Sequence, residues 1–181
     1  ADFEITPDVA IVDPDLAETM PQKLVAHTGM DAMTHAIEAY VSTANCDFTD
    51  PLALHAIKMI QNDLVDSYNG DMAKRDAMHN AQCLAGMAFS NALLGIVHSM
   101  AHALGAVYDT PHGIANAMLL PTVMRFNGAD SATAQRFREI LCEIGRPDAA
   151  NLNDQDVINT FVWMISELSK SVGITQRVRD V

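Results

Sequence analysis

Two side chains that can bind a metal ion lie four residues apart within residues 28–40. Asp31 and His35 have the spacing that places two side chains on one face of a helix, where both can reach the same point. A carboxylate oxygen and an imidazole nitrogen are both ligands for first-row divalent cations. Alternatively, Asp31 is a first-turn acid behind a Thr28 cap, and His35 is a hydrogen-bonded core histidine. The pair by itself leaves both interpretations open.

A second pair of candidate ligands, the histidines His98 and His102, lies one helical turn apart within residues 95–105. The other residues of this segment are mostly small and apolar. A polar group buried without a hydrogen bond costs on the order of a few kcal/mol, so each imidazole needs a partner. That partner is a metal ion or, alternatively, a backbone carbonyl or a neighbouring helix.

A further histidine, His112, follows Thr110 and Pro111. Threonine is a common helix N-cap and proline suits the first helical position, so His112 is predicted in the first turn of a helix. Alone it could equally be a surface histidine in a turn. Together, the three segments can supply one carboxylate and three imidazoles to a tetrahedral or open five-coordinate site for Fe(II), Zn(II), Co(II) or Mn(II).

Helices must position these side chains, because from Leu16 onward the apolar residues follow helical periodicity. The β-branched run Val9 to Val12 lies between turn residues and is predicted to be one short strand. Stop signals of Gly, Asn and Pro separate the later elements. Helices are expected at about 15–20, 22–42, 50–69, 73–94, 95–107, 111–127, 131–144 and 153–168, with a short one after them. The predicted fold class is all-α, a multi-helix bundle with a short N-terminal strand.

Composition argues against several classes of partner. Eleven Lys and Arg against 23 Asp and Glu give a net charge of −12, which opposes binding to nucleic acid or to an anionic membrane. The three cysteines are widely spaced and form no Cys-x-x-Cys pair, as in a reduced, cytoplasmic protein. No secretory signal is recognised, and polar residues interrupt the apolar stretch 87–108 too often for a membrane helix.

Five segments, in the same order, resemble those of the iron-containing (group III) alcohol dehydrogenases of the dehydroquinate synthase-like superfamily. These segments are 13–21, 28–40, 86–91, 98–105 and 110–121. The resemblance implies that the metal ligands are Asp31, His35, His98 and His112.

The same resemblance implies roles for other residues. His102 is then not a ligand but lies beside the nicotinamide and relays the substrate proton, which makes it both a catalytic and a cofactor-binding residue. Phe89 matches a position that lines the substrate pocket. Asp15, Leu16 and Met20 match the stretch next to the cofactor cleft.

The implied reaction is hydride transfer between a small alcohol or aldehyde and NAD or NADP, with the alcohol oxygen bound to Fe2+ or Zn2+. A divalent cation can lower the pKa of bound water from 15.7 to about 7, and a bound alcohol should be acidified in the same sense. A nearby histidine, whose ordinary pKa is about 6.5, can handle the proton. Because the family often forms dimers or larger assemblies, the resemblance is compatible with a homo-oligomer.

The chain departs from the family because it has only nine glycines and no Gly-rich phosphate-binding turn. We therefore expect residues 1–13 to be a strand remnant of the nucleotide-binding domain, and residues 14–181 to be a helical metal-binding catalytic domain that lacks its final helices. The first residue is Ala, which suggests an excised fragment. Such a chain is predicted to be inactive alone.

Two other functions compete with this hypothesis. A zinc-dependent glycerol dehydrogenase or dehydroquinate synthase would share the helical domain, but the motif at 110–113 and the fourth ligand argue against them. A non-catalytic helical metal-binding module would have a saturated site and would not fold without metal. A di-iron bundle is disfavoured because the sequence has no Glu-x-x-His pair.

Overall fold

The computed structural model describes residues 3–180, and within them it contains seven α-helices and no strand. The α-helices are α1 (Gln22–Val41), α2 (Asp50–Tyr68), α3 (Met72–Ala92), α4 (Ile96–Tyr108), α5 (His112–Asn127), α6 (Ser131–Glu143) and α7 (Asp154–Ser171). Short 3-10 helices lie at Phe3–Ile5, Pro14–Ala17, Pro147–Asn151 and Val178–Asp180. The predicted all-α class is confirmed.

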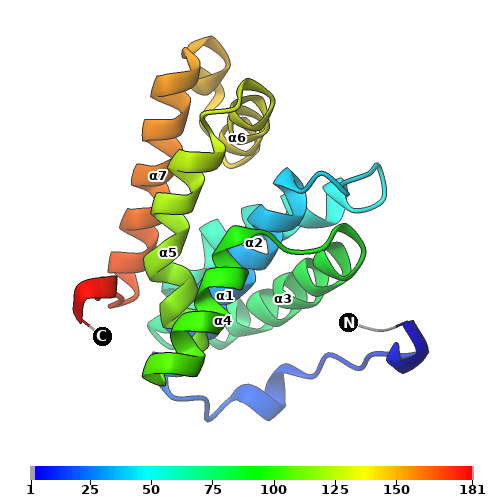
Figure 1. The fold of residues 1–181 in the computed structure, drawn as a ribbon. Coiled ribbons are helices and arrows are strands. Elements are labelled where there is room, and N and C mark those ends of the chain that lie inside the picture. The colour runs from blue at the N-terminus through cyan, green and yellow to red at the C-terminus, as the bar shows by residue number, and fades with distance from the viewer. Residues whose placement is uncertain (1–2, 181) are drawn as a thin grey trace.

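Helix α1 is the centre of the molecule. It packs against α2, α3 and α5, and more than half of its residues are buried. One group of helices consists of α1, α2 and α3, which contact one another. In the other group, α5 packs against both α7 and α4 (Figure 1). The two groups of helices meet where α1 contacts α5.

Several helices begin where the sequence supplies an N-cap. Asp71 accepts hydrogen bonds from the first turn of α3, Asp130 from that of α6, and Asn153 from that of α7. These bonds satisfy backbone N–H groups that have no partner within the helix. The predicted helix boundaries agree with the observed ones to within a few residues.

Two local predictions are wrong. Val9 to Val12 is not a strand, because a strand needs a hydrogen-bonded neighbour and the described residues hold none; the side chains of Val9 and Ile11 are 76% and 89% exposed. Thr110 does not cap α5, because Pro111 has the extended ψ of 130° and itself occupies the N-cap position. The Thr110 hydroxyl is instead buried without a hydrogen-bond partner.

Within residues 3–180, no single helix has the length and apolar character needed to cross a membrane. Helices α3 and α4 meet those criteria only as a pair, and they are bent by 103° where they join.

Gly113 fixes the distance between α5 and α1, and we expect Gly113→Ala to destabilise the protein. A Cβ at this position would lie 2.1 Å from the carbonyl oxygen of His27, which is backbone and cannot rotate away. Overpacking of this kind costs about 1–3 kcal/mol. Gly86→Ala is the control, because a Cβ there meets nothing and alanine should gain up to about 1 kcal/mol within α3. Urea denaturation measures both, and equal stability of the two variants would contradict the prediction.

Candidate metal centre

One face of α1 carries three side chains with ligand or acid-base chemistry. Asp31, His35 and Glu38 follow one another at helical spacing in the middle of α1, not in its first turn. Thr28 lies within the same helix and donates its hydroxyl to the carbonyl of Leu24, so it does not cap. The alternative of a capped first-turn acid is therefore excluded.

The structure brings Asp31 together with His98 and His112. The Nε2 atoms of His98 and His112 each lie 3.4 Å from Asp31 Oδ1, and one ligand atom from each residue lies within 4.8 Å of the others. His98 is buried, Asp31 is partly buried and His112 is exposed. Three helices, α1, α4 and α5, thus contribute to one cluster that is closed on one side and open on the other.

His35 lies beside this trio. Its Nδ1 is 3.9 Å from Asp31 Oδ2, and its ring stacks on the ring of His98 with centroids 4.3 Å apart. It is not among the residues whose ligand atoms lie within 4.8 Å of one another.

Asn116, which the sequence analysis missed, packs against the trio. Its Nδ2 lies 2.6 Å from Asp31 Oδ1 and 3.1 Å from Nε2 of both His98 and His112. An amide has two hydrogens for these three acceptors, and its Oδ1 is buried without a partner. One carboxylate and two imidazoles facing one point with few donors is a donor set that fits a divalent cation. The sequence signal that could have identified Asn116 was its place one helical turn after His112.

Glu38 is the second residue that the sequence analysis missed. Its side chain is almost fully buried, and Oε2 lies 2.7 Å from Nδ1 of His98. It also accepts hydrogen bonds from the backbone N–H groups of Gly95 and Val97. The available signal was its place on the α1 face that carries Asp31 and His35.

The charges of the cluster depend on these contacts. Burial lowers the pKa of His98, but hydrogen bonds to Asp31 and Glu38 outweigh it and raise the pKa to about 9. Burial raises the pKa of Asp31, but its partners, His98 first, hold it below its usual value. Burial lowers the pKa of His35 to about 4, against the influence of Asp31. At neutral pH and without metal, therefore, Asp31 is a carboxylate, His35 is neutral, and His98 is a positively charged imidazolium with a proton on both ring nitrogens.

The proton on His98 sits where a cation would bind. Protonated His98 forms an ion pair through Nε2 with Asp31, so that the Asn116 amide is left to donate to Asp31 and His112. A divalent cation bound by these atoms would supply the positive charge that the proton otherwise supplies.

We therefore expect metal binding to release about one proton at pH 7.5. The metal-free pKa of His98 is about 9, so the ring loses its proton when a cation takes Nε2. The apparent affinity should rise about tenfold per pH unit as pH approaches 9 and then level off, because above that pH no proton has to leave. Calorimetry with Zn2+ in two buffers of different ionisation enthalpy measures the released protons. Release of no proton at pH 7.5 would contradict this expectation.

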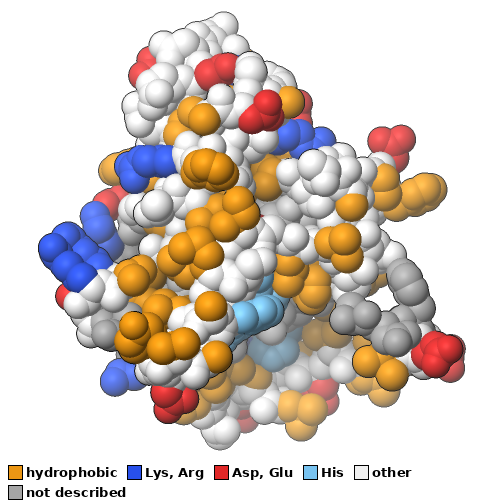
Figure 2. Space-filling view, viewed as in Figure 1, with side chains coloured by type: hydrophobic (Ala, Val, Ile, Leu, Met, Phe, Trp, Pro, Cys, Tyr) orange, Lys and Arg blue, Asp and Glu red, His pale blue; other side chains and the backbone are white. Residues whose placement is uncertain are grey.

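His102 and Phe89 lie around the cluster. The exposed His102 is one turn after His98 on α4, with ring centroids 5.2 Å from His112 and 6.1 Å from His98, and it is not part of the trio. Phe89 of α3 stacks on His35 with ring centroids 4.3 Å apart. Histidine side chains reach the surface among hydrophobic side chains (Figure 2).

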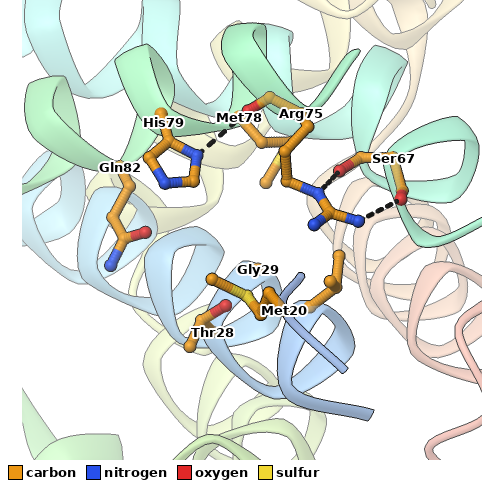
Figure 3. A pocket seen from close by; sticks show the side chains of 9 residues that line it. Met20, Thr28, Gly29, Ser67, Arg75, Met78, His79 and Gln82 are labelled. Carbon is orange, nitrogen blue, oxygen red and sulfur yellow. Dashed lines mark hydrogen bonds between the residues drawn. The ribbon is translucent and has the colours of Figure 1, made fainter. Parts of the chain in front are cut away.

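The segment with Asp15, Leu16 and Met20 lies against α3. The buried Arg75 donates to the carbonyl of Ala17 in this segment, and it also donates to Ser67 of α2. Met20 lines a pocket of about 20 Å³ beside Arg75 (Figure 3). Leu16 and Met20 also line an open cavity of about 490 Å³, whereas Asp15 lines neither.

Comparison with known protein families gives one match that covers most of the chain. Residues 25–181 match the family described as "Fe-containing alcohol dehydrogenase family, C-terminal".

Comparison with individual proteins gives related results. The chain is 55% identical to an NADPH-dependent butanol dehydrogenase of Clostridium saccharobutylicum, over 99% of this chain and 45% of that protein. It is 43% identical to a lactaldehyde reductase of Escherichia coli K12, over 97% of this chain and 45% of that protein. The chain thus spans less than half the length of these relatives.

Solved structures share the arrangement of the helices. An iron-containing alcohol dehydrogenase of Thermococcus thioreducens matches with a TM-score of 0.87 at 37% identity, over 99% of this chain and 45% of that one. A 1,3-propanediol oxidoreductase matches with a TM-score of 0.87 at 43% identity, over 93% of this chain and 44% of that one.

Proposed function

Since this chain belongs to the Fe-containing alcohol dehydrogenase family, we propose that it forms the metal-binding part of an NAD(P)-dependent alcohol dehydrogenase. The reaction is the interconversion of a small alcohol and its aldehyde by hydride transfer. The observation that carries this proposal is the convergence of Asp31, His98 and His112 on one point, with His35 stacked beside them.

In this proposal Asp31, His35, His98 and His112 hold Fe2+ or Zn2+. When bound, the cation supplies Lewis acidity toward the substrate oxygen. Burial of His98 between two carboxylates keeps that side of the site dry, while the exposed His112 leaves the opposite side open to substrate. Such an open position is what separates a catalytic site from a saturated structural site.

The remaining residues act around that open side. His102 is exposed next to His112 and exchanges the substrate proton with solvent. Phe89, stacked on His35, forms part of the apolar wall of the substrate pocket. The bound NAD or NADP passes along the segment that holds Asp15, Leu16 and Met20. Of these residues, Leu16 and Met20 line the 490 Å³ cavity, and Asp15 lies on the same 3-10 helix as Leu16.

The test uses a chimera in which this chain replaces the matching 45% of the Clostridium saccharobutylicum butanol dehydrogenase. We expect the chimera to reduce butanal with NADPH, and this activity to require Fe2+ or Zn2+. We also expect about one equivalent of bound metal per chain, measured by mass spectrometry. The control is the same chimera with His98→Ala and His112→Ala, which should lose both. A folded, metal-loaded chimera that reduces no aldehyde in a panel of short-chain substrates would refute the proposed function.

A further inference from the structure

A buried carboxylate of α1 lies between the metal cluster and the first turn of α4. Glu38 is 1% exposed, and its Oε2 accepts from the Gly95 N–H at 3.0 Å while its Oε1 accepts from the Val97 N–H at 2.7 Å. The N-cap residue of α4 is Gly95, which has no side chain to cap the helix. Glu38 therefore performs the capping of α4 from a different helix.

The backbone of α4 is shaped to receive this carboxylate. A Cβ on Gly95 would lie 2.7 Å from Glu38 Oε1, so only glycine allows the close approach. The two backbone N–H donors of Gly95 and Val97 thus hold the Glu38 carboxylate beside its third partner, His98.

That third contact decides which nitrogen of His98 faces the cluster. Nδ1 lies 2.7 Å from Glu38 Oε2, whereas Nε2 lies 3.4 Å from Asp31 Oδ1. An ionised carboxylate can only accept, so Nδ1 must carry a hydrogen. When a cation replaces the proton on Nε2, the lone pair of that nitrogen is the one that faces the cluster.

We propose that Glu38 is a positioning residue of the metal centre, which holds His98 in the tautomer and orientation that present Nε2 to the cation. The inference rests on the proposed function, because it concerns a ligand of that centre. It assigns Glu38 two tasks at once, capping α4 and orienting His98. A ligand histidine commonly donates its second ring N–H to a carboxylate, which fixes the ring and makes it a stronger donor to the metal.

Glu38→Gln separates orientation from mere space filling. The glutamine amide has nearly the shape of the carboxylate, but it has one NH2 group in place of one oxygen. In one orientation this NH2 faces the N–H of Val97, and in the other it faces both the N–H of Gly95 and Nδ1 of His98. In neither orientation are all three partners satisfied. We expect the affinity for Zn2+ to fall about 10–100-fold, as with other outer-shell partners of a ligand histidine.

The matched control is Ile96→Gly. Ile96 is the first residue of α4 and is 41% exposed, and glycine there weakens the same helix turn without touching Glu38 or His98. This variant should melt earlier yet bind Zn2+ with unchanged affinity. The absorption spectrum of the Co2+-loaded protein should change in Glu38→Gln and not in Ile96→Gly.

A measurement on the unaltered protein covers the case in which Glu38→Gln fails to fold. Long-range 1H–15N spectra of the Zn2+-loaded chain should show His98 bound through Nε2, with a hydrogen on Nδ1 that exchanges slowly with water. Binding through Nδ1, or Glu38→Gln with unchanged affinity and spectrum, would overturn the inference while leaving the metal centre in place. Failure of the unaltered chain to bind Zn2+ would overturn the metal centre and this inference with it.

Discussion

Replacing Asp31 with asparagine is expected to weaken Zn2+ binding by about 10²–10⁴-fold, because removing the partner of a buried charge costs about 3–5 kcal/mol and His98, which faces Asp31, is buried. Asp31 Oδ1 lies 3.4 Å from Nε2 of both His98 and His112. Asparagine keeps the shape and one oxygen but removes the charge that a cation needs nearby.

The loss should depend on pH in a predictable direction. Asp31 is one of the two carboxylates that raise the pKa of His98 to about 9, so Asp31→Asn lowers the pKa of this ring. At neutral pH, protons then compete less with Zn2+ for His98 in the variant than in the unaltered protein. The difference in affinity should therefore be smaller at pH 7 than at pH 9.

Competition titration against a chromophoric chelator measures these affinities. Asp63→Asn is the control, because the buried Asp63 also carries a carboxylate in an ion pair, with Lys74 at 2.7 Å, but lies on α2 away from the trio. It should cost stability and leave Zn2+ affinity unchanged. If Asp31→Asn bound Zn2+ like Asp63→Asn, the carboxylate would not be a ligand.

The second large effect is expected at His102. In the butanol dehydrogenase chimera, His102→Phe should lower turnover by about 10²–10⁴-fold, the range typical of losing a positioned acid or base. Its metal content should stay unchanged, because the proposed function gives His102 a role in proton transfer and not as a ligand. Phenylalanine keeps a ring at the stacking distance of 5.2 Å from His112 but cannot exchange a proton.

The control for this variant is His55→Phe, which replaces an exposed histidine of α2. Turnover of the chimera and its metal content by mass spectrometry should both be unaffected by this change. Loss of metal in His102→Phe would instead make His102 a ligand, and unchanged turnover would exclude it from proton transfer.

The sequence by itself determined the helices. Caps such as Asp71 and Asn153, and breaks such as Gly145, act through hydrogen bonds and backbone angles that involve only neighbouring residues. The same locality explains why Asp31 and His35 could be paired from their spacing alone. It also explains the error at Val9 to Val12, since β-branched residues favour a strand but cannot provide its partner.

Only the tertiary structure decided which side chains meet. His98 and His102 are alike in sequence, in the same apolar helix and one turn apart, yet it is His98 that lies against Asp31 while His102 is exposed. The roles of Glu38 and Asn116 arise from the same packing of α1 against α4 and α5. Spacing along one helix defines a face, but the angle at which three helices cross selects the atoms on those faces that come within reach of one cation.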